Sequence, residues 1–159
     1  MAGNVAPLAS IGVPVYNGER FLARTLDSLL GQTETDFELM IADNASTDAT
    51  QSICEDYARR DPRVRYVRHE ANRGAYFNWN FVARNARGRY FKWASANDYC
   101  APTMLARCVE ALESDAGIVL CHGQTCIVDE ADKEQRIYER DIEVLDQRPS
   151  VRFKRVCSE

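Results

Sequence analysis

Two hydrophobic periodicities alternate along most of this chain. Short apolar runs of the length typical of buried strands occur at Leu8–Val15, Phe37–Ala42, Val64–Arg68, Arg89–Ala94 and Ile118–Cys121. Between these runs, apolar residues recur at helical spacing, which predicts helices over Glu19–Leu30, Asp48–Arg60, Ala75–Ala86 and Thr103–Glu113. Regular strand–helix alternation indicates βαβ crossovers. The pattern therefore predicts an α/β fold, a three-layer α/β/α sandwich with a mostly parallel sheet.

The last part of the chain has a weaker pattern. Two shorter strands are predicted at Thr125–Val128 and Arg136–Tyr138, on either side of a turn at Asp129–Lys133. Residues 139–159 are polar and only weakly periodic. The length suits one domain, so we expect a single domain over residues 1–159, with its core in residues 8–128.

Four predicted strand-to-helix turns carry most of the candidate chemistry. Right-handed crossovers place them all at one edge of the sheet, where ligands bind in open α/β folds. The turns are Val15–Gly18, Asp43–Asp48, His69–Gly74 and Ser95–Ala101. Asp43 and Asn44 end a strand and can contact a nucleotide base or a ribose hydroxyl, whereas the alternative for Asp43 is a purely turn-forming or helix-capping acid. We expect this turn and the acidic turn Ser95–Tyr99 to converge on one ligand.

Composition and charge exclude several classes of protein. The net charge of −4 and the pI near 5.3 make general nucleic-acid binding a poor fit. Six cysteines form no CxxC pair, which favours reduced thiols in a cytoplasmic protein. The N-terminus lacks the features of a signal peptide, and no run approaches the ~18–20 apolar residues of a membrane span. Peripheral association with a membrane remains open.

Residues Leu8 to Val128 resemble family 2 glycosyltransferases, which have the GT-A fold. The order strand, PVYN, helix, Gln, strand, DNASTD is matched almost continuously, and NRGAYFNWNFVARNARGRYF and WASANDYCAP follow it in the same order. That many ordered motifs make the resemblance specific. It implies a UDP- or dTDP-linked nucleotide-sugar donor and transfer of the sugar to a glycan or lipid acceptor with inversion.

The resemblance implies nucleotide-binding roles at several positions of this chain. The segment that lines the base matches Pro14, Val15 and Tyr16, and the acid facing the nucleotide in the same loop matches Glu19. The pair that contacts uracil or ribose matches Asp43 and Asn44. The segment beneath the ribose and diphosphate matches Asn72, Gly74 and Asn80. Arg73 is either a solvated turn charge or a diphosphate contact, and Trp79 stands where many members have arginine. Trp79 and Trp93 are expected to be core aromatics.

The turn Ser95–Asp98 matches the region where the family presents acids to a divalent metal and to the ribose. Ser95, Ala96 and Asn97 replace acids found in many members, which leaves Asp98 as the carboxylate expected to bind Mn²⁺ or Mg²⁺. Asn97 is expected beside the nucleotide. The alternative for Asp98 is a cap on the following helix. One carboxylate can still hold a cation when two phosphate oxygens and water complete its shell, although Asn97 weakens the affinity.

The general base of the family lies well downstream of the metal-binding acid. Asp129 and Glu130 come too early and suit a hairpin turn, so the catalytic base is expected beyond the end of this chain, with Asp129, Glu130 and Asp132 as the fallback. Residues 139–159 would then begin an acceptor-side region. The alternative function is a catalytically incomplete GT-A fragment that binds nucleotide or dimerises. In either case we expect apolar surface that favours a homodimer.

Overall fold

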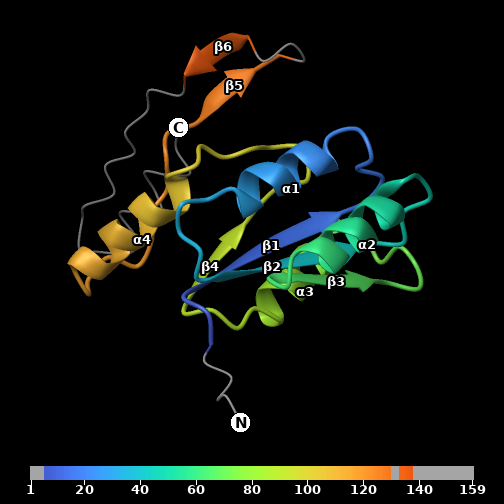
Figure 1. The fold of residues 1–159 in the computed structure, drawn as a ribbon, viewed down its shortest axis with the longest axis horizontal. Coiled ribbons are helices and arrows are strands. Elements are labelled where there is room, and N and C mark those ends of the chain that lie inside the picture. Colours follow the sequence, from blue (N-terminus) through green and yellow to red (C-terminus); the bar gives the residue numbers. More distant parts are fainter. Residues whose placement is uncertain (1–5, 130–132, 138–159) are drawn as a thin grey trace. The chain divides into compact units, whose positions relative to one another are not determined.

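A four-stranded parallel sheet forms the centre of the molecule (Figure 1). The computed structural model describes residues 6–129 and 133–137. The strands are β1 (Ala9–Val15), β2 (Phe37–Asp43), β3 (Val64–Arg68) and β4 (Tyr90–Trp93), in the order β3-β2-β1-β4. All three neighbouring pairs are parallel. The predicted α/β fold class is therefore confirmed, and every strand of this sheet ends at the same edge.

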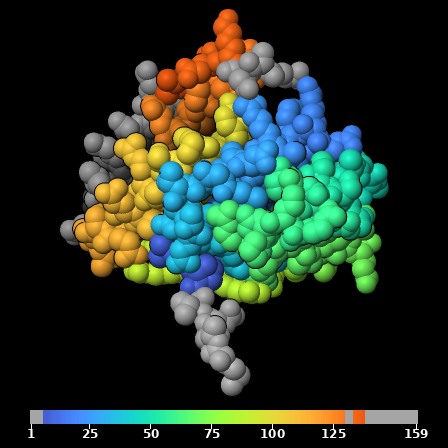
Figure 2. Space-filling view, viewed as in Figure 1, coloured from blue at the N-terminus to red at the C-terminus, as the bar shows by residue number. Residues whose placement is uncertain are grey.

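Helices cover both faces of the sheet. Helices α1 (Leu22–Leu30), α2 (Thr50–Arg60) and α4 (Met104–Ser114) contribute buried residues to a large apolar core on one face. Helix α3 (Ala75–Arg84) packs through Val82 against a separate cluster with Met40 and Ala42 on the other face. Figure 2 shows the face with the large core, where α1 and α2 cover the sheet. This is the three-layer arrangement that right-handed crossovers produce when the chain reverses direction after β3.

Strands β1 and β2 are buried along their whole lengths because helices lie on both sides. Their buried polar side chains have partners. Glu38 accepts hydrogen bonds from the Ser10 hydroxyl at 2.7 Å, from Arg65 Nη1 at 2.9 Å and from the Arg87 amide at 2.8 Å. Burial raises the pKa of Glu38, but these bonds outweigh it and the net shift is downward. This polar cluster lies near the amino ends of the strands, the edge opposite the predicted site.

Two residues of β1 shape its surroundings. A Cβ atom on Gly12 would lie 2.8 Å from Val82, so glycine permits the close approach of α3. The Gly12 carbonyl accepts a hydrogen bond from the Ala94 amide on the β4 side. Because alternate residues of a strand face the same neighbour, the missing N–H of Pro14 also falls on that side. Pairing between β1 and β4 ends here, which allows the loops after the two strands to diverge.

One predicted strand is wrong. Residues Ile118–Cys121 form no strand, and Val119 and Leu120 are 88% and 78% exposed. An apolar run becomes a strand only when another strand pairs with it, and no such partner exists among the described residues. The helices of the structure are shorter than predicted in two places, since α1 begins at Leu22 and not at Glu19, and α3 ends at Arg84 and not at Ala86.

The described residues fall into two compact units that divide after Val119. The second unit contains the antiparallel hairpin of β5 (Cys126–Val128) and β6 (Glu134–Ile137), which confirms the predicted pair of short strands. The Asp129 carboxylate accepts the Lys133 amide at 3.0 Å inside its turn. Residues 139–159 lie outside the described part of the chain. None of the described helices has the length and hydropathy required to cross a membrane.

Candidate functional site

The sheet order creates a crevice between β1 and β4. After β1 the chain adds β2 and β3 on one side of β1, and it then returns to add β4 on the other side. In open α/β sheets, ligands bind at the point where the strand order reverses in this way, beyond the carboxyl ends of the strands. A pocket of about 340 Å³, the switch-point pocket, lies there. The loop after β1 and the loop after β4 both line it, through Tyr16, Asn17, Gly18, Arg20, Phe21, Ala96 and Asn97. The predicted residues Tyr16 and Asn97 are thus brought together.

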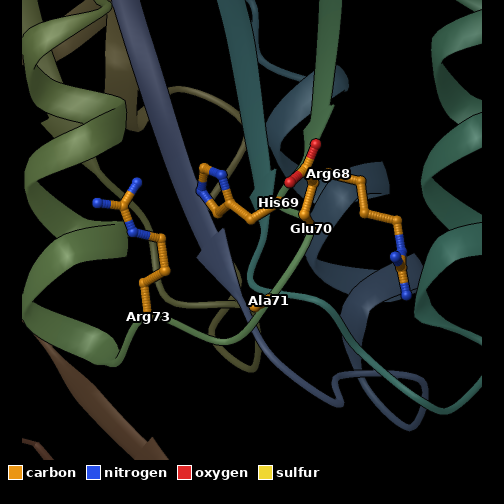
Figure 3. A pocket seen from close by; sticks show the side chains of 5 residues that line it. All are labelled: Arg68, His69, Glu70, Ala71 and Arg73. Atoms are coloured by element: carbon orange, nitrogen blue, oxygen red, sulfur yellow. The ribbon is translucent and has the colours of Figure 1, made fainter.

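A second pocket of about 430 Å³, the β3–α3 pocket, lies at the end of β3. It is lined by Arg68, His69, Glu70, Ala71 and Arg73. Figure 3 shows the side chains of Arg68 and Arg73 extending to opposite sides of the loop that joins β3 to α3. The Arg73 guanidinium lies 3.6 Å from the centroid of the Phe77 ring, a cation–π contact that holds it against α3. Its role toward a nucleotide remains a prediction.

Asp43 is fully buried at the end of β2. Its Oδ1 accepts the Ser46 amide at 2.8 Å, and its Oδ2 accepts the Tyr66 hydroxyl at 3.0 Å and lies 3.3 Å from Arg68 Nε. Burial, together with the Asp43 charge, raises the pKa of Tyr66, so this hydroxyl stays protonated and donates. Oδ1 of Asp43 therefore supports the turn after β2 and Oδ2 contacts β3, while the nucleotide role of Asp43 remains a prediction.

Asn44 is also buried, with 2% of its surface exposed, although it is a predicted nucleotide contact. Its side chain reaches across to the loop before α3. Nδ2 donates to Asn72 Oδ1 at 2.8 Å and to the Gly74 carbonyl at 3.2 Å, while Oδ1 accepts the Arg73 amide at 3.0 Å. We call these four residues the Asn44 cluster. The structure thus brings together four of the residues that the sequence predicts.

The loops after β1 and β2 are joined by hydrogen bonds between side chains and backbone. The Asn17 amide donates to Ser46 Oγ at 2.9 Å, and Asn17 Oδ1 accepts the Thr47 amide at 2.9 Å. The Gly18 amide donates to Thr50 Oγ1 at 2.8 Å. Asn17 and Ala45 have φ values of 51° and 61°, in the left-handed region that asparagine tolerates better than alanine. These bonds fix one wall of the switch-point pocket.

Glu19 belongs to the same junction. Its Oε2 accepts the Ala49 amide at 2.9 Å, just before α2, and its own amide donates to Asp48 Oδ2 at 3.0 Å. Burial raises the pKa of Asp48, but its hydrogen bonds with Thr50 and the Glu19 amide together outweigh burial and lower the pKa overall. A carboxylate that accepts free amides at a helix start acts as a cap. Glu19 does not line the switch-point pocket, and its nucleotide role remains a prediction.

Three further residues of the sequence prediction lie apart from these clusters. Asn80 donates to the Tyr76 carbonyl of its own helix at 2.8 Å. Trp79 and Trp93 are 38% and 48% exposed, so the expectation that they are core aromatics is wrong. Trp93 Nε1 donates to the Trp79 carbonyl at 3.1 Å, which joins the end of β4 to α3. Both rings reach the surface because Phe91 and Val82 already fill the core beneath α3.

The sequence prediction missed Asn78. This buried side chain donates from Nδ2 to the Ala42 carbonyl at 2.7 Å and lies 3.4 Å from the Val15 carbonyl, so it joins the ends of β1 and β2. Since Nδ2 is the donor, Oδ1 accepts from Nε2 of His69 at 3.0 Å, which assigns the proton to that nitrogen. A polar residue four positions before Val82, on the apolar face of α3, was the available signal.

Asp98 lies in the exposed loop after β4. Its backbone amide donates to the Ser95 carbonyl at 3.4 Å, and α4 begins after Thr103 without a side-chain cap, so the capping alternative for Asp98 is wrong. Within the described ranges, no hydrogen bond or ion pair engages its carboxylate, and no group of three acidic, histidine or cysteine side chains could hold a metal. One carboxylate and the Asn97 amide fit a cation that takes most of its oxygens from a diphosphate and water.

Comparison with known proteins agrees with this geometry. Residues 10–155 match the family described as Glycosyl transferase family 2. The chain is 39% identical over 109 residues to the uncharacterized glycosyltransferase EpsJ of Bacillus subtilis, covering 69% of this chain and 31% of EpsJ. It is 33% identical over 112 residues to chondroitin synthase of Escherichia coli, covering 70% of this chain and 16% of that protein.

Two solved structures have a similar fold. S. aureus TarS in complex with UDP superposes with a TM-score of 0.62 at 28% identity, over 67% of this chain and 32% of TarS. The mannosyltransferase PcManGT from Pyrobaculum calidifontis, in complex with GDP-Man and Mn²⁺, gives 0.64 at 26% identity, over 81% of this chain and 38% of PcManGT. This chain spans less than two fifths of each of these four proteins. With its fold, its ordered motifs and these matches, the chain belongs to glycosyl transferase family 2.

Proposed function

We propose that this chain binds the nucleotide-sugar donor of a glycosyltransferase, UDP- or dTDP-linked, and that the enzyme transfers the sugar to a glycan or lipid acceptor with inversion. The observation that carries the proposal is the switch-point pocket between β1 and β4, which Ala96 and Asn97 line from the loop after β4. Asp98, the next residue of that loop, is exposed and its carboxylate has no described partner. The UDP complex of TarS and the GDP-Man and Mn²⁺ complex of PcManGT support the ligand class.

The proposed donor extends from the buried strand ends to the loop after β4. In this arrangement Pro14, Val15 and Tyr16 border the base, and Asn97 lies beside the ribose or diphosphate. Tyr16 is half exposed in the pocket wall, so its ring is available to a ligand. Arg73 and the start of α3 supply positive charge and free amides for phosphate oxygens.

We propose that Asp98 holds a divalent cation, Mn²⁺ or Mg²⁺, only together with the donor diphosphate. A bound cation neutralises the charge that develops on the leaving diphosphate. Asp98 and Asn97 offer too few oxygen ligands to hold it alone, which predicts weak metal binding without nucleotide. The residues of this chain therefore orient the diphosphate, and the cation completes the site.

The proposed catalytic base lies outside this chain. Asp129, the fallback acid in the described part, is already engaged in the hairpin turn, where Oδ2 accepts from Gln135 Nε2 at 2.7 Å. Glu130 and Asp132 lie outside the described residues. Since this chain spans about a third of EpsJ, we place the acceptor pocket and the base in further parts of such an enzyme. The isolated chain should then transfer sugar very slowly or not at all.

The alternative is a catalytically incomplete nucleotide-binding or dimerisation module. The replacement of acids by Ser95, Ala96 and Asn97 favours it. The exposed residues Val119 and Leu120 offer apolar surface for a homodimer, which light scattering would test. A monodisperse monomer would argue against the dimer and would leave the nucleotide proposal in place.

Calorimetric titration tests the binding proposal. UDP should bind in the presence of Mn²⁺ and lose most of its affinity when the metal is chelated. Asp98→Asn should lose the metal-dependent part and keep the same unfolding midpoint. Glu110→Gln on the exposed face of α4 is the matched control, because it also removes one exposed acid. A UDP affinity that changes neither when Mn²⁺ is removed nor in Asp98→Asn would refute the metal role.

A further inference from the structure

The Asn44 cluster joins the buried end of β2 to the exposed loop before α3. The Asn44 amide donates to the Val15 carbonyl at 2.9 Å, so its backbone is part of the sheet edge. Its side chain spans to Asn72, Arg73 and Gly74, which are all exposed loop residues. Asn72 Oδ1 also accepts the Gly74 amide at 2.9 Å. One buried carboxamide therefore fixes three consecutive residues of the loop to the sheet.

The polarity of this carboxamide is fully specified. Both N–H groups of Asn44 face acceptors, at Asn72 Oδ1 and the Gly74 carbonyl, while Oδ1 faces the Arg73 amide. A carboxylate in its place would present oxygens to two acceptors and would lose both donors. An alanine would leave all three loop groups without this partner. Asparagine at position 44 therefore matches what the loop requires.

The loop in turn sets two of the groups that we place beside the diphosphate, Arg73 and the start of α3. Gly74 has a φ of 84° and is the N-cap of α3, and its carbonyl accepts the Asn78 amide at 3.3 Å in the first turn. The backbone amide of Arg73 donates to Asn44 Oδ1, so Asn44 fixes the backbone from which the Arg73 side chain extends. A change at Asn44 thus alters both the direction of Arg73 and the start of α3, without contacting a ligand.

We infer that Asn44 is a positioning residue: it holds loop 72–74 in the shape that binds the donor diphosphate, and it does not itself recognise the base. This inference rests on the proposed function. It departs from the role that the family resemblance implies, a contact with uracil or ribose. The decisive observation is that a side chain 2% exposed has both donors already used within the protein.

A double-mutant cycle between Asn44 and Asn72 tests the inference. Asn44→Ala and Asn72→Ala should each weaken UDP–Mn²⁺ binding about tenfold, since both remove the bond between the two side chains and each also removes bonds to residues 73–74 of the same loop. The double variant should also lose about tenfold, and not a hundredfold, because both changes break one contact set. Asn85→Ala at the opposite end of α3 is the matched control, and it should leave the affinity unchanged.

Base selectivity separates positioning from base recognition. If Asn44 acts through the loop, Asn44→Ala should weaken UDP, CDP and GDP by the same factor and leave their ratios unchanged. A selective loss for UDP, additive with Asn72→Ala, would overturn the inference. Asn72 is exposed, so Asn72→Ala keeps the test usable if Asn44→Ala fails to fold: unchanged UDP–Mn²⁺ affinity in that variant would also overturn it.

Absence of any nucleotide binding by the wild-type chain would refute the proposed function. The positioning role of Asn44 would then fail with it. The hydrogen bonds of the Asn44 cluster can still be tested by urea unfolding of the wild-type chain, the two single variants and the double variant. Unfolding free energies should show coupling between positions 44 and 72, and additive losses would show that the Asn44 cluster is not an energetic unit.

Discussion

The Glu19 amide donates to Asp48 Oδ2 at 3.0 Å, so the loop after β1 is attached to the residues just before α2. Glu19 returns the contact, because its own carboxylate accepts the Ala49 amide. The two bonds link parts of the chain about thirty residues apart and hold the wall of the switch-point pocket. Glu19 thus has a structural task that its position in the family motif does not reveal.

Glu19→Gln should lower stability modestly and leave UDP affinity nearly unchanged. The amide oxygen of glutamine can still accept from Ala49, but without charge assistance at the helix start, so we expect a loss of about 0.5 kcal/mol. Urea unfolding and UDP titration of the same samples measure both effects. A large drop in UDP affinity with unchanged stability would instead support the direct nucleotide contact that the resemblance implies.

Tyr66→Phe should destabilise the fold through Asp43. The variant removes the hydroxyl that donates to a fully buried carboxylate, leaving Arg68 and the Ser46 amide as its partners. Hydrogen bonds to charged groups contribute about 1.5–3 kcal/mol, so we expect a loss of about 2 kcal/mol in urea unfolding. Tyr90→Phe, which loses a bond to exposed Glu113, is the matched control and should lose much less.

Glu38 should make stability depend on pH. Its pKa in the folded state is lowered, so its stabilising contribution is present above its ordinary value of 4.5 and is lost as the pH falls through the folded-state pKa. Glu38→Gln should therefore be less stable than the wild-type chain at pH 7, and the difference should shrink below pH ~4. A difference that stays constant from neutral to acidic pH would contradict this account of the buried cluster.

Much of the fold could be predicted because local pattern and tertiary structure agree in β1 to β4. Continuous apolar runs such as Phe37–Ala42 are typical of strands covered on both faces, and the helices between them impose parallel order. Ile118–Cys121 has the same apolar character but no strand beside it in the described structure. An apolar pattern indicates that a segment would be buried as a strand, but it does not indicate whether a neighbouring strand is available to pair with it.

The candidate site was predicted in position but not in the direction of its side chains. Asp43 and Asn44 do end β2 at the expected edge, yet both are turned inward to protein partners. Asn78 was missed because its role depends on carbonyls of β1 and β2 that are far away in sequence. Hydrogen bonds between residues far apart in the sequence produce no recognisable sequence pattern, so only the folded structure reveals them.

Cysteine reactivity should follow burial. Cys54 is fully buried, and burial, with a smaller effect of the Asp43 charge, raises its pKa to about 12. The thiolate is the reactive form, so Cys54 should resist iodoacetamide at pH 8 while exposed Cys126 reacts. Mass spectrometry of native and urea-unfolded samples measures this. Equal labelling rates of the two cysteines in the native chain would show that the core around Cys54 opens readily.

Paramagnetic broadening by Mn²⁺ bound with UDP tests the central claim most directly. Amide signals of ¹⁵N-labelled chain should broaden at Tyr16–Gly18, Arg73–Gly74 and Ser95–Asp98, the loops at the carboxyl edge of the sheet. Amides of Ser10 and Arg87, at the opposite edge, should remain sharp. Asp98→Asn should abolish the pattern at the same Mn²⁺ and UDP concentrations. Broadening centred on Ser10 and Arg87, or none at the carboxyl edge with UDP in excess, would contradict the proposed donor site.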